Sequence, residues 1–218
     1  MKIISEVFNY IIYKISQNLF LFFFTLYNRY TFHGKRYIPR KHVNGIIIAS
    51  NHASNMDPML AGLPMHRRIH FLAKKSLFKG FVGWWTKSVG AFPVDREDVA
   101  PSSLKKIISI LKEGKTLILF PEGTRSENGE LQEFKKGIGL IAKKTRSLVI
   151  PSYIKGSYRM LPKGSKFPKP VKLTTYYGKP VDLNDLYDDE NTDREIVYEK
   201  IAERIRSRVV ELKEKSER

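Results

Sequence analysis

Cysteine is absent from the 218-residue sequence. This absence excludes disulfide bonds, thiolate zinc sites and cysteine nucleophiles. It suits a reducing compartment, although many exported chains also lack cysteine. Acidic residues are scarce as well, since 22 Asp and Glu stand against 39 Lys and Arg and leave a net charge of +17. An excess of this size favours a polyanionic partner, which is either nucleic acid or an anionic membrane surface.

Signatures of nucleic-acid and metal binding are missing too. The sequence has no zinc-finger spacing and no RNA-recognition signature, and its basic residues are spread along the chain. Four histidines have no acidic residue at a useful spacing and are interpreted as surface or structural groups: His33, His42, His66 and His70. We therefore expect no nucleic-acid partner, no metal ion and no cofactor.

A long uninterrupted hydrophobic run is the third feature that the sequence lacks. Residues 3–32 are dense in Ile, Phe, Leu and Tyr, but Lys14, Gln17 and Asn18 interrupt them. No window of roughly 18 residues is free of charged or strongly polar groups, and no signal-peptide cleavage site follows. We expect residues 1–32 to form one or two amphipathic helices in the membrane interface, with tyrosines near the headgroups. A core helix and a single short span are the alternatives.

Residues 33–218 are expected to form one α/β domain, in which a largely parallel mixed sheet is flanked by helices. Short apolar runs predict strands, with the last one half-exposed, and apolar residues at helical spacing predict the helices between them. The final helix has a capping-box pattern at Thr192 and Glu195 and an apolar stripe from Val197 to Leu212. The expected strands are residues 46–49, 69–73, 91–94, 116–120, 148–153 and 171–177; the other expected helices are residues 101–113 and 134–144.

The segment after the first expected strand of this domain carries a histidine and an aspartate five positions apart, His52 and Asp57. Ligands in α/β proteins bind beyond the carboxyl ends of strands. Histidine acts as a general base near neutral pH, and a carboxylate can orient it and stabilise the imidazolium. The pair lacks the serine of a hydrolase triad, so the attacking hydroxyl could belong to the substrate. Alone, such a pair is more often structural than catalytic.

A second polar turn follows the expected strand at residues 116–120. It contains Glu122, Gly123, Thr124 and Arg125. An arginine suits bidentate binding of phosphate, and glycine permits close approach of the backbone. Glu122 could hold Arg125 or a substrate hydroxyl. A plain turn with an exposed ion pair is the alternative.

Together these segments resemble the glycerolipid acyltransferase family, and within it bacterial 1-acylglycerol-3-phosphate acyltransferases. The resemblance spans about residues 32–180 and rests on four blocks in the family's order. Two shorter segments, residues 73–78 and 134–137, also look like family segments. The four blocks are Asn51-His52 through Asp57-Pro58, Gly90 through Arg96, Phe120 through Ser126, and Val149-Ile150-Pro151.

The resemblance implies transfer of a fatty acyl group from a thioester to the sn-2 hydroxyl of lysophosphatidic acid, which makes phosphatidic acid in phospholipid biosynthesis. His52 is then the base that takes the hydroxyl proton, and Asp57 orients it. The thioester of acyl-carrier protein or coenzyme A is a co-substrate, and the enzyme is expected on membrane lipids at the cytoplasmic face of the cell membrane. The residues expected to bind substrate are Lys74, Lys75, Arg96, Glu122, Gly123, Thr124 and Arg125.

Other features stay open at the level of the sequence. The apolar stretch 78–85 is an acyl-chain tunnel, a segment that dips into the bilayer, or a core helix. The basic loop at residues 156–170 is long enough to suggest a function or mobility. Acylation of another lysolipid, or hydrolysis by the same His–Asp pair acting on water, is the alternative reaction.

Overall fold

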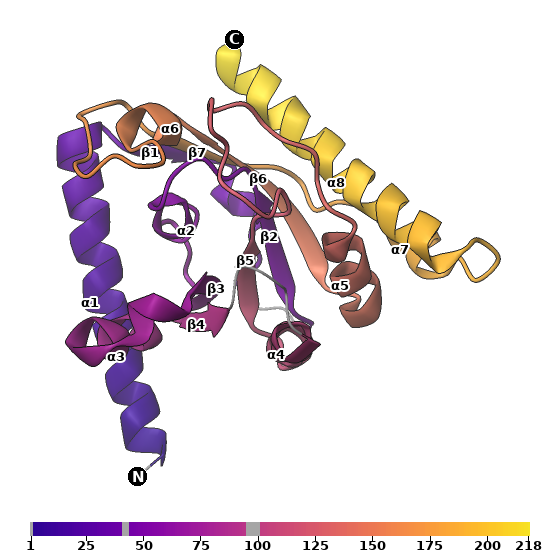
Figure 1. Cartoon of the computed structure of the whole chain (residues 1–218), viewed down its shortest axis with the longest axis horizontal. Coiled ribbons are helices and arrows are strands. Elements are labelled where there is room, and N and C mark those ends of the chain that lie inside the picture. Colours follow the sequence, from indigo (N-terminus) through magenta and orange to yellow (C-terminus); the bar gives the residue numbers. More distant parts are fainter. Residues whose placement is uncertain (1, 41–43, 95–100) are drawn as a thin grey trace.

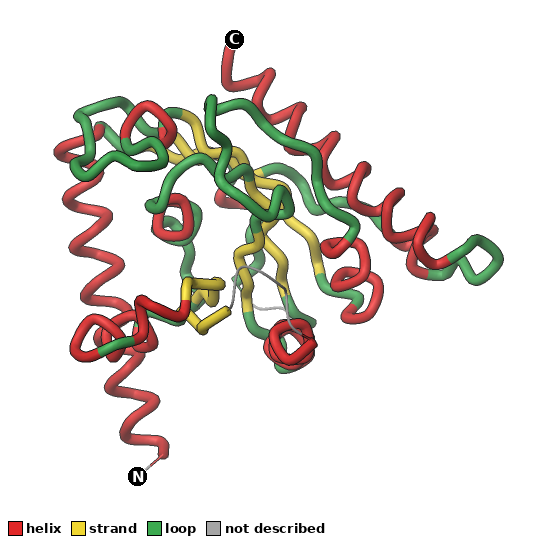
Figure 2. Tube along the Cα trace, viewed as in Figure 1, coloured by secondary structure: helices red, strands yellow, loops and turns green. Residues whose placement is uncertain are grey.

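The computed structural model describes residues 2–40, 44–94 and 101–218. A seven-stranded sheet runs through the molecule in the order β1-β7-β6-β2-β5-β3-β4 (Figures 1 and 2). Every neighbouring pair is parallel except β6 and β7. The largely parallel mixed sheet expected from the sequence is thereby confirmed. The strands are β1 (Thr31–His33), β2 (Ile46–Ser50), β3 (Ile69–Lys74), β4 (Ala91–Val94), β5 (Thr116–Leu119), β6 (Leu148–Lys155) and β7 (Thr174–Tyr177).

Helices cover both faces of the sheet. In Figure 1, α4, α5 and α8 lie on one side of the sheet and α1, α2 and α3 on the other. Two short 3-10 turns, at Lys35–Tyr37 and Lys75–Phe78, complete the regular structure of the described residues. The helices are α1 (Lys2–Asn28), α2 (Asp57–Leu60), α3 (Gly80–Ser88), α4 (Pro101–Lys112), α5 (Gly137–Thr145), α6 (Ser157–Met160), α7 (Asn184–Tyr187) and α8 (Arg194–Glu217).

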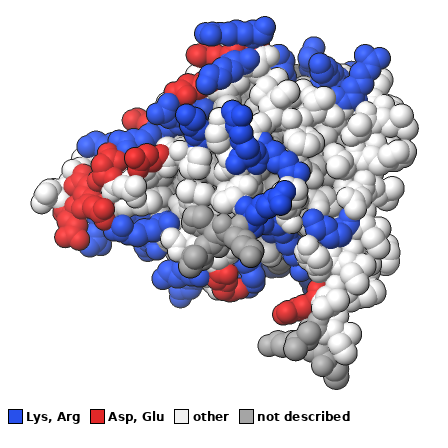
Figure 3. Space-filling view, turned by 180° about the vertical axis from the view of Figure 1, so that it is seen from behind, with Lys and Arg blue, Asp and Glu red and all other residues white. Residues whose placement is uncertain are grey.

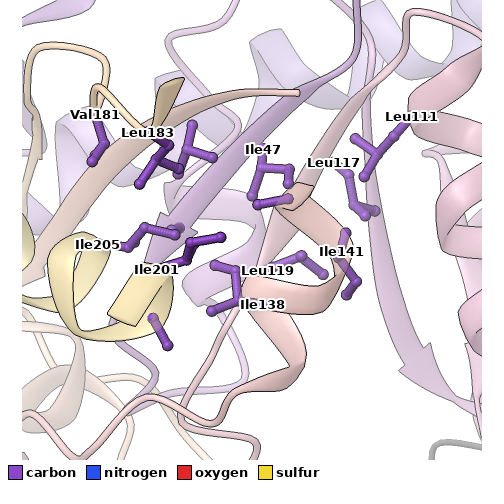
Figure 4. Close-up of a cluster of buried hydrophobic side chains, with 14 of the residues drawn as sticks. Ile47, Leu111, Leu117, Leu119, Ile138, Ile141, Val181, Leu183, Ile201 and Ile205 are labelled. Atoms are coloured by element: carbon purple, nitrogen blue, oxygen red, sulfur yellow. The ribbon is translucent and has the colours of Figure 1, made fainter. Parts of the chain in front are cut away.

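The central strand β2 is buried on both sides, which explains its continuous run of apolar residues. Ile47 and Ala49 belong to the core beneath α4, α5 and α8, part of which Figure 4 shows. Ile46 and Ile48 belong to the core shared with α1 and α2. Two separate cores on the two faces therefore hold β2, and with it the loop that follows, in a fixed place.

The strand expected at residues 171–177 begins only at Thr174 and is largely buried, so the expectation of half exposure was wrong. The physical reason is contact with α2: Thr175 Oγ1 donates to the Leu60 carbonyl at 3.3 Å, and the hydroxyl of Tyr177 donates to the Ala61 carbonyl at 2.8 Å. The outer edge of β7 is covered by β1, a short strand that the sequence did not reveal. It pairs with the outer side of β7, from Thr31 opposite Thr174 to His33 opposite Tyr176. β7 is therefore an interior strand, and Thr175 is fully buried.

The N-terminal segment forms one continuous 27-residue helix, α1, which is within the expectation of one or two helices. Two other helix boundaries differ from the expectation. α5 begins at Gly137 rather than at residue 134, because the N–H of Lys135 donates to the Pro121 carbonyl. α8 is capped by Asp193, whose carboxylate accepts from the N–H groups of Glu195 and Ile196, and not by Thr192. Within the described part of the chain, no helix combines the length and apolarity that crossing a membrane requires.

Candidate active site

The two polar turns expected from the sequence leave the same edge of the sheet. β2 and β5 are parallel neighbours, with Ala49 opposite Leu119, so the loops after them emerge side by side. Asn51 anchors the first loop across the other neighbour, β6. Its Oδ1 accepts from the N–H of Ile154 at 2.7 Å, and its Nδ2 donates to the Ile154 carbonyl at 3.2 Å.

His52 and Asp57 form a direct hydrogen bond. Nδ1 of His52 lies 2.9 Å from Oδ2 of Asp57. A carboxylate only accepts, so Nδ1 carries the proton and the lone pair is left on Nε2. Asp57 is fully buried, whereas 14% of the His52 side chain stays exposed. A base on Nε2 with limited access to solvent suits proton abstraction from a bound substrate.

Asp57 is also hydrogen-bonded by the loop that precedes it. Its Oδ2 also accepts from the N–H groups of Ala53 and Ser54, at 2.6 and 2.7 Å. Asp57 begins α2, where the helix N-terminus favours a negative charge. The five-residue spacing thus lets the chain turn back on itself, so that one carboxylate oxygen fixes both the loop and the imidazole.

The second turn contacts the first turn at His52. Phe120 stacks on the His52 ring with centroids 4.1 Å apart and planes at 18°. Oε1 of Glu122 accepts from the N–H of His52 at 3.0 Å, and the N–H of Ser126 donates to the His52 carbonyl at 2.8 Å. The ring and both main-chain groups of His52 are therefore all positioned by residues 120–126.

Glu122 is buried, with only 3% of its surface exposed. Burial raises the pKa of its carboxyl to about 7; the N–H donors of His52 and Gln132 lower this pKa, and the charge of Asp57 raises it. The sequence analysis placed Glu122 among the substrate-binding residues; its partners in the structure are the main-chain N–H groups of His52 and Gln132.

A cation that the sequence analysis did not assign to the site lies beside this turn. Gly123 has φ +77, and a methyl group placed on it would lie 2.9 Å from Cε and Nζ of Lys135. The ammonium of Lys135 thus lies over the bare backbone of Gly123. Arg125, two residues further on, is half-buried, and Thr124 is exposed. The available signal was the segment 134–137, which looks like a family segment but by itself suggests no role.

Comparison with known proteins supplies the family. A family model described as Acyltransferase matches residues 29–155, which is more than half of the chain. The chain belongs to the acyltransferase family. The family resemblance noted in the sequence is thus confirmed.

Individual relatives of this acyltransferase carry a more specific name. Two proteins named 1-acyl-sn-glycerol-3-phosphate acyltransferase, from Streptococcus pneumoniae and Bacillus subtilis, are each 34% identical to the chain. The first match covers 71% of this chain and 56% of the relative, and the second 63% and 67%. The chain thus spans little more than half the length of the S. pneumoniae relative.

A solved structure shows the same fold. It is the crystal structure of the 1-acyl-sn-glycerophosphate (LPA) acyltransferase PlsC from Thermotoga maritima, which is 33% identical and aligns with a TM-score of 0.61. The alignment covers 80% of this chain and 69% of that chain. The fold of this acyltransferase is therefore the one that the sequence pattern led us to expect.

The remaining site residues predicted from the sequence fall in two groups. Lys74 ends β3, the strand next to β5, and Lys75 opens the following 3-10 turn, so both lie near the edge that carries His52 and are exposed. Arg96 lies outside the described residues. Among the residues that are described, no group of three or more His, Asp or Glu side chains is placed to hold a metal ion.

An apolar cavity of 260 Å³ adjoins the His52 loop of the acyltransferase. Asn55 and Met56 of that loop and Pro58 of α2 contribute to its wall, together with Phe20 of α1 and Trp85 of α3. Its lining is almost entirely apolar. An alkyl chain is the kind of ligand that such a wall accommodates.

The apolar stretch 78–85 lies partly against the cavity and is partly exposed. Trp85 lines the cavity, and its Nε1–H donates to Ser16 Oγ at 3.1 Å. Val82 also lines the cavity, although 55% of its surface is exposed, whereas Phe81 and Trp84 are exposed over 77 and 41% of their surfaces. A core helix does not fit this exposure.

Proposed function

We propose that this acyltransferase moves a fatty acyl group from a thioester to the sn-2 hydroxyl of 1-acylglycerol-3-phosphate and so makes phosphatidic acid. One observation carries the proposal: within the described residues, the hydrogen bonds of the His52 side chain end at Asp57 and reach no serine hydroxyl. A base without its own nucleophile needs a hydroxyl from a substrate. The names of the relatives from S. pneumoniae, B. subtilis and T. maritima support this acceptor.

The proposed reaction is a direct transfer. Nε2 of His52 takes the proton of the acceptor hydroxyl as that oxygen attacks the thioester carbonyl, and the imidazolium is stabilised by Asp57. The tetrahedral intermediate then collapses, the C–S bond breaks, and the thiolate receives the proton from His52. Holding the two substrates in line at His52 supplies much of the acceleration, because it removes the entropic cost of their encounter.

The acceptor phosphate is proposed to bind to cations around the two turns. Lys135 lies over Gly123, Arg125 is two residues further along the same turn, and Lys74 ends the strand next to β5. Arg96 and Lys75 are added to this set from the sequence alone. A bidentate arginine together with ammonium groups is suited to a phosphate monoester.

The 260 Å³ cavity is proposed to hold an acyl chain. It is lined by Asn55 and Met56, which lie between His52 and Asp57 in the sequence. A chain in this cavity would end with its carbonyl near the imidazole. The length of the cavity would then set the preferred length of the chain.

The membrane is the proposed source of the acceptor. α1 leaves a row of apolar side chains exposed along one side, from Ile4 to Leu26. Trp84 of α3 packs against Phe8 of α1, so the exposed side chains of α3 continue the same surface. We call these exposed side chains of α1 and α3 the apolar face, and Figure 3 shows little charge along the edge where α1 lies. An exposed apolar area of this kind marks a membrane or protein contact.

A transfer assay tests the proposed reaction. The assay uses lysophosphatidic acid as acceptor and compares acyl-carrier protein and coenzyme A thioesters as donors. We expect His52→Ala to reduce the transfer rate on the order of a thousandfold. His33→Ala is the matched control, because His33 stacks on Tyr176 away from the site. This variant should keep the wild-type transfer rate. Undiminished transfer by His52→Ala would overturn the mechanism.

Hydrolysis is the second reaction that the His–Asp pair could support. A labelled acyl thioester distinguishes the two reactions in the presence of lysophosphatidic acid. Label in phosphatidic acid supports transfer. Label only in free fatty acid would mean that water is the acceptor.

A further inference from the structure

The loop at residues 162–172 carries a bare aromatic side chain among lysines. Phe167 is exposed over 81% of its surface, the largest exposed fraction among the exposed large hydrophobic side chains described. Lys163, Lys166, Lys169 and Lys172 recur every third residue around it, and all four are exposed. The loop contains no acidic residue. An exposed aromatic ring among lysines suits a surface that has an apolar layer beneath negatively charged groups.

The loop is fastened to the C-terminal end of α1. The hydroxyl of Tyr27 donates to the Pro168 carbonyl at 3.1 Å. Nδ2 of Asn28 donates to the carbonyls of Lys169 and Val171, at 2.9 and 3.0 Å. Asn28 is almost completely buried, so these bonds are protected from water. The position of Phe167 relative to α1 is therefore set by the fold.

The same end of α1 bears much of its exposed apolar surface. Phe22 and Leu26 are exposed over 68 and 75% of their surfaces. Phe23 stacks on Tyr27, with centroids 5.4 Å apart, next to the bond from Tyr27 to the loop. The loop therefore extends the apolar face and adds cations at its end, and Figure 3 shows Lys and Arg side chains at the upper end of the uncharged edge.

Three of the lysines keep their charge available. Lys163 is paired with Glu127 at 2.7 Å. Lys166, Lys169 and Lys172 have no ion pair within the described part of the chain. Each lysine close to an anionic lipid surface strengthens membrane binding.

We propose that the loop at residues 162–172 is a docking element for anionic phospholipid. Phe167 inserts among the acyl chains, while Lys166, Lys169 and Lys172 bind the phosphates of the surrounding headgroups. This inference rests on the proposed attachment of the apolar face to the membrane. It adds a lipid preference to that attachment, and it fixes which end of α1 meets the charged headgroups. A bare aromatic side chain favours a bilayer over an acidic protein, because an inserted ring needs an apolar layer.

Vesicle binding by the full chain tests the inference. Binding is measured by flotation with phosphatidylcholine vesicles, with and without phosphatidylglycerol. The triple variant K166S/K169S/K172S is expected to bind the anionic vesicles roughly a hundredfold more weakly and the neutral vesicles as wild type does. Phe167→Ser is expected to bind both kinds of vesicle about tenfold more weakly.

A matched control removes the same charge from another face. K105S/K106S/K112S changes three exposed lysines on α4, which packs on the side of the sheet opposite to α1. This variant is expected to keep most of the wild-type affinity for anionic vesicles. Thermal unfolding of each variant verifies that it is folded, since all six lysine side chains are exposed.

The possible outcomes separate the inference from the proposed function. The inference is overturned if the loop variant binds anionic vesicles as wild type does, or if the α4 variant loses as much affinity. It is also overturned if the loop variant loses affinity for acyl-carrier protein but keeps its vesicle binding. If wild type binds neither kind of vesicle, membrane attachment fails as well. Vesicle binding needs no turnover, so none of these results depends on the transfer assay.

Discussion

Oδ2 of Asp57 lies 2.9 Å from Nδ1 of His52 and accepts from two main-chain N–H groups of the intervening loop. One buried oxygen therefore holds the loop and the imidazole together before any substrate binds. Such a base loses no entropy to ordering when the acceptor arrives. Because the loop and His52 share the Oδ2 atom of Asp57, substitutions of Asp57 and His52 are expected to have related effects on the transfer rate.

We expect Asp57→Asn to lower kcat by on the order of a hundredfold or more, with a smaller effect on the KM for the acceptor. The neutral amide of asparagine cannot stabilise the imidazolium, although asparagine has nearly the same shape as aspartate. The double variant H52A/D57N should be little slower than H52A alone, because the two residues act as one unit. Steady-state transfer rates test this. Additive losses in the double variant would show that Asp57 acts independently of His52.

The raised pKa of Glu122 predicts that the stability of the folded protein depends on pH. Its pKa is raised from 4.5 to about 7 in the folded protein, chiefly by burial. Between these values the unfolded chain releases the proton and the folded chain keeps it, so stability falls as pH rises. The loss is complete above about pH 7 and amounts to a few kcal/mol, on the order of 3.

Glu122→Gln isolates this contribution. The amide oxygen can still accept from the N–H of His52, but the side chain no longer titrates. We expect the free energy of unfolding of wild type, measured in urea, to fall relative to that of the variant between about pH 5 and 7.5. Parallel curves for the two proteins over this range would contradict the raised pKa.

Lys135 and Lys136 form a natural pair for testing phosphate binding. The Lys135 side chain lies over Gly123, whereas Lys136 makes an ion pair with Glu195 of α8. We expect Lys135→Ala to raise the KM for lysophosphatidic acid several-fold, because a charge-assisted contact to the phosphate is lost. Lys136→Ala should leave this KM close to the wild-type value. Equal KM values for all three proteins would remove Lys135 from the site.

The apolar cavity predicts a dependence on chain length. Ala73 is a small residue in its wall, and Ala73→Phe would fill part of the 260 Å³. We expect kcat/KM to fall for long acyl donors and to be retained for short ones. A competition assay with a mixture of chain lengths measures the ratio directly. An equal fall for all lengths would indicate general damage in place of a shortened tunnel.

The position of the candidate site was accessible from local sequence. His52, Asp57 and the turn at residues 120–126 follow apolar runs that could only be core strands, and parallel strands deliver their following loops to one edge. Lys135 was not accessible in this way. It reaches the site because a main-chain bond from Lys135 to Pro121 folds residues 127–135 back over the turn, and no local pattern encodes that contact.

Gln17 also has a role that could not be predicted from the local sequence. In the sequence it only interrupts an apolar run. In the fold it is buried, and its Nε2 donates to the carbonyls of Gly62, Leu63 and Met65. A polar residue that weakens the prediction of a membrane span thus joins α1 to the segment after α2. Such a role depends on carbonyl groups about 45 residues away, which no periodicity reveals.

Periodicity, charge and motif order by themselves determined the α/β class, the central strands, the His–Asp pair and the basic, apolar N-terminus, because each depends on neighbours within one element. Tertiary structure decided the rest. Contacts with α2 buried side chains of β7, pairing with β1 covered its outer edge, and desolvation gave Glu122 its raised pKa. Hydrogen bonds from α1 placed Phe167 at the end of the apolar face. Burial and long-range bonds depend on segments brought together only by folding, and a linear pattern does not record those distances.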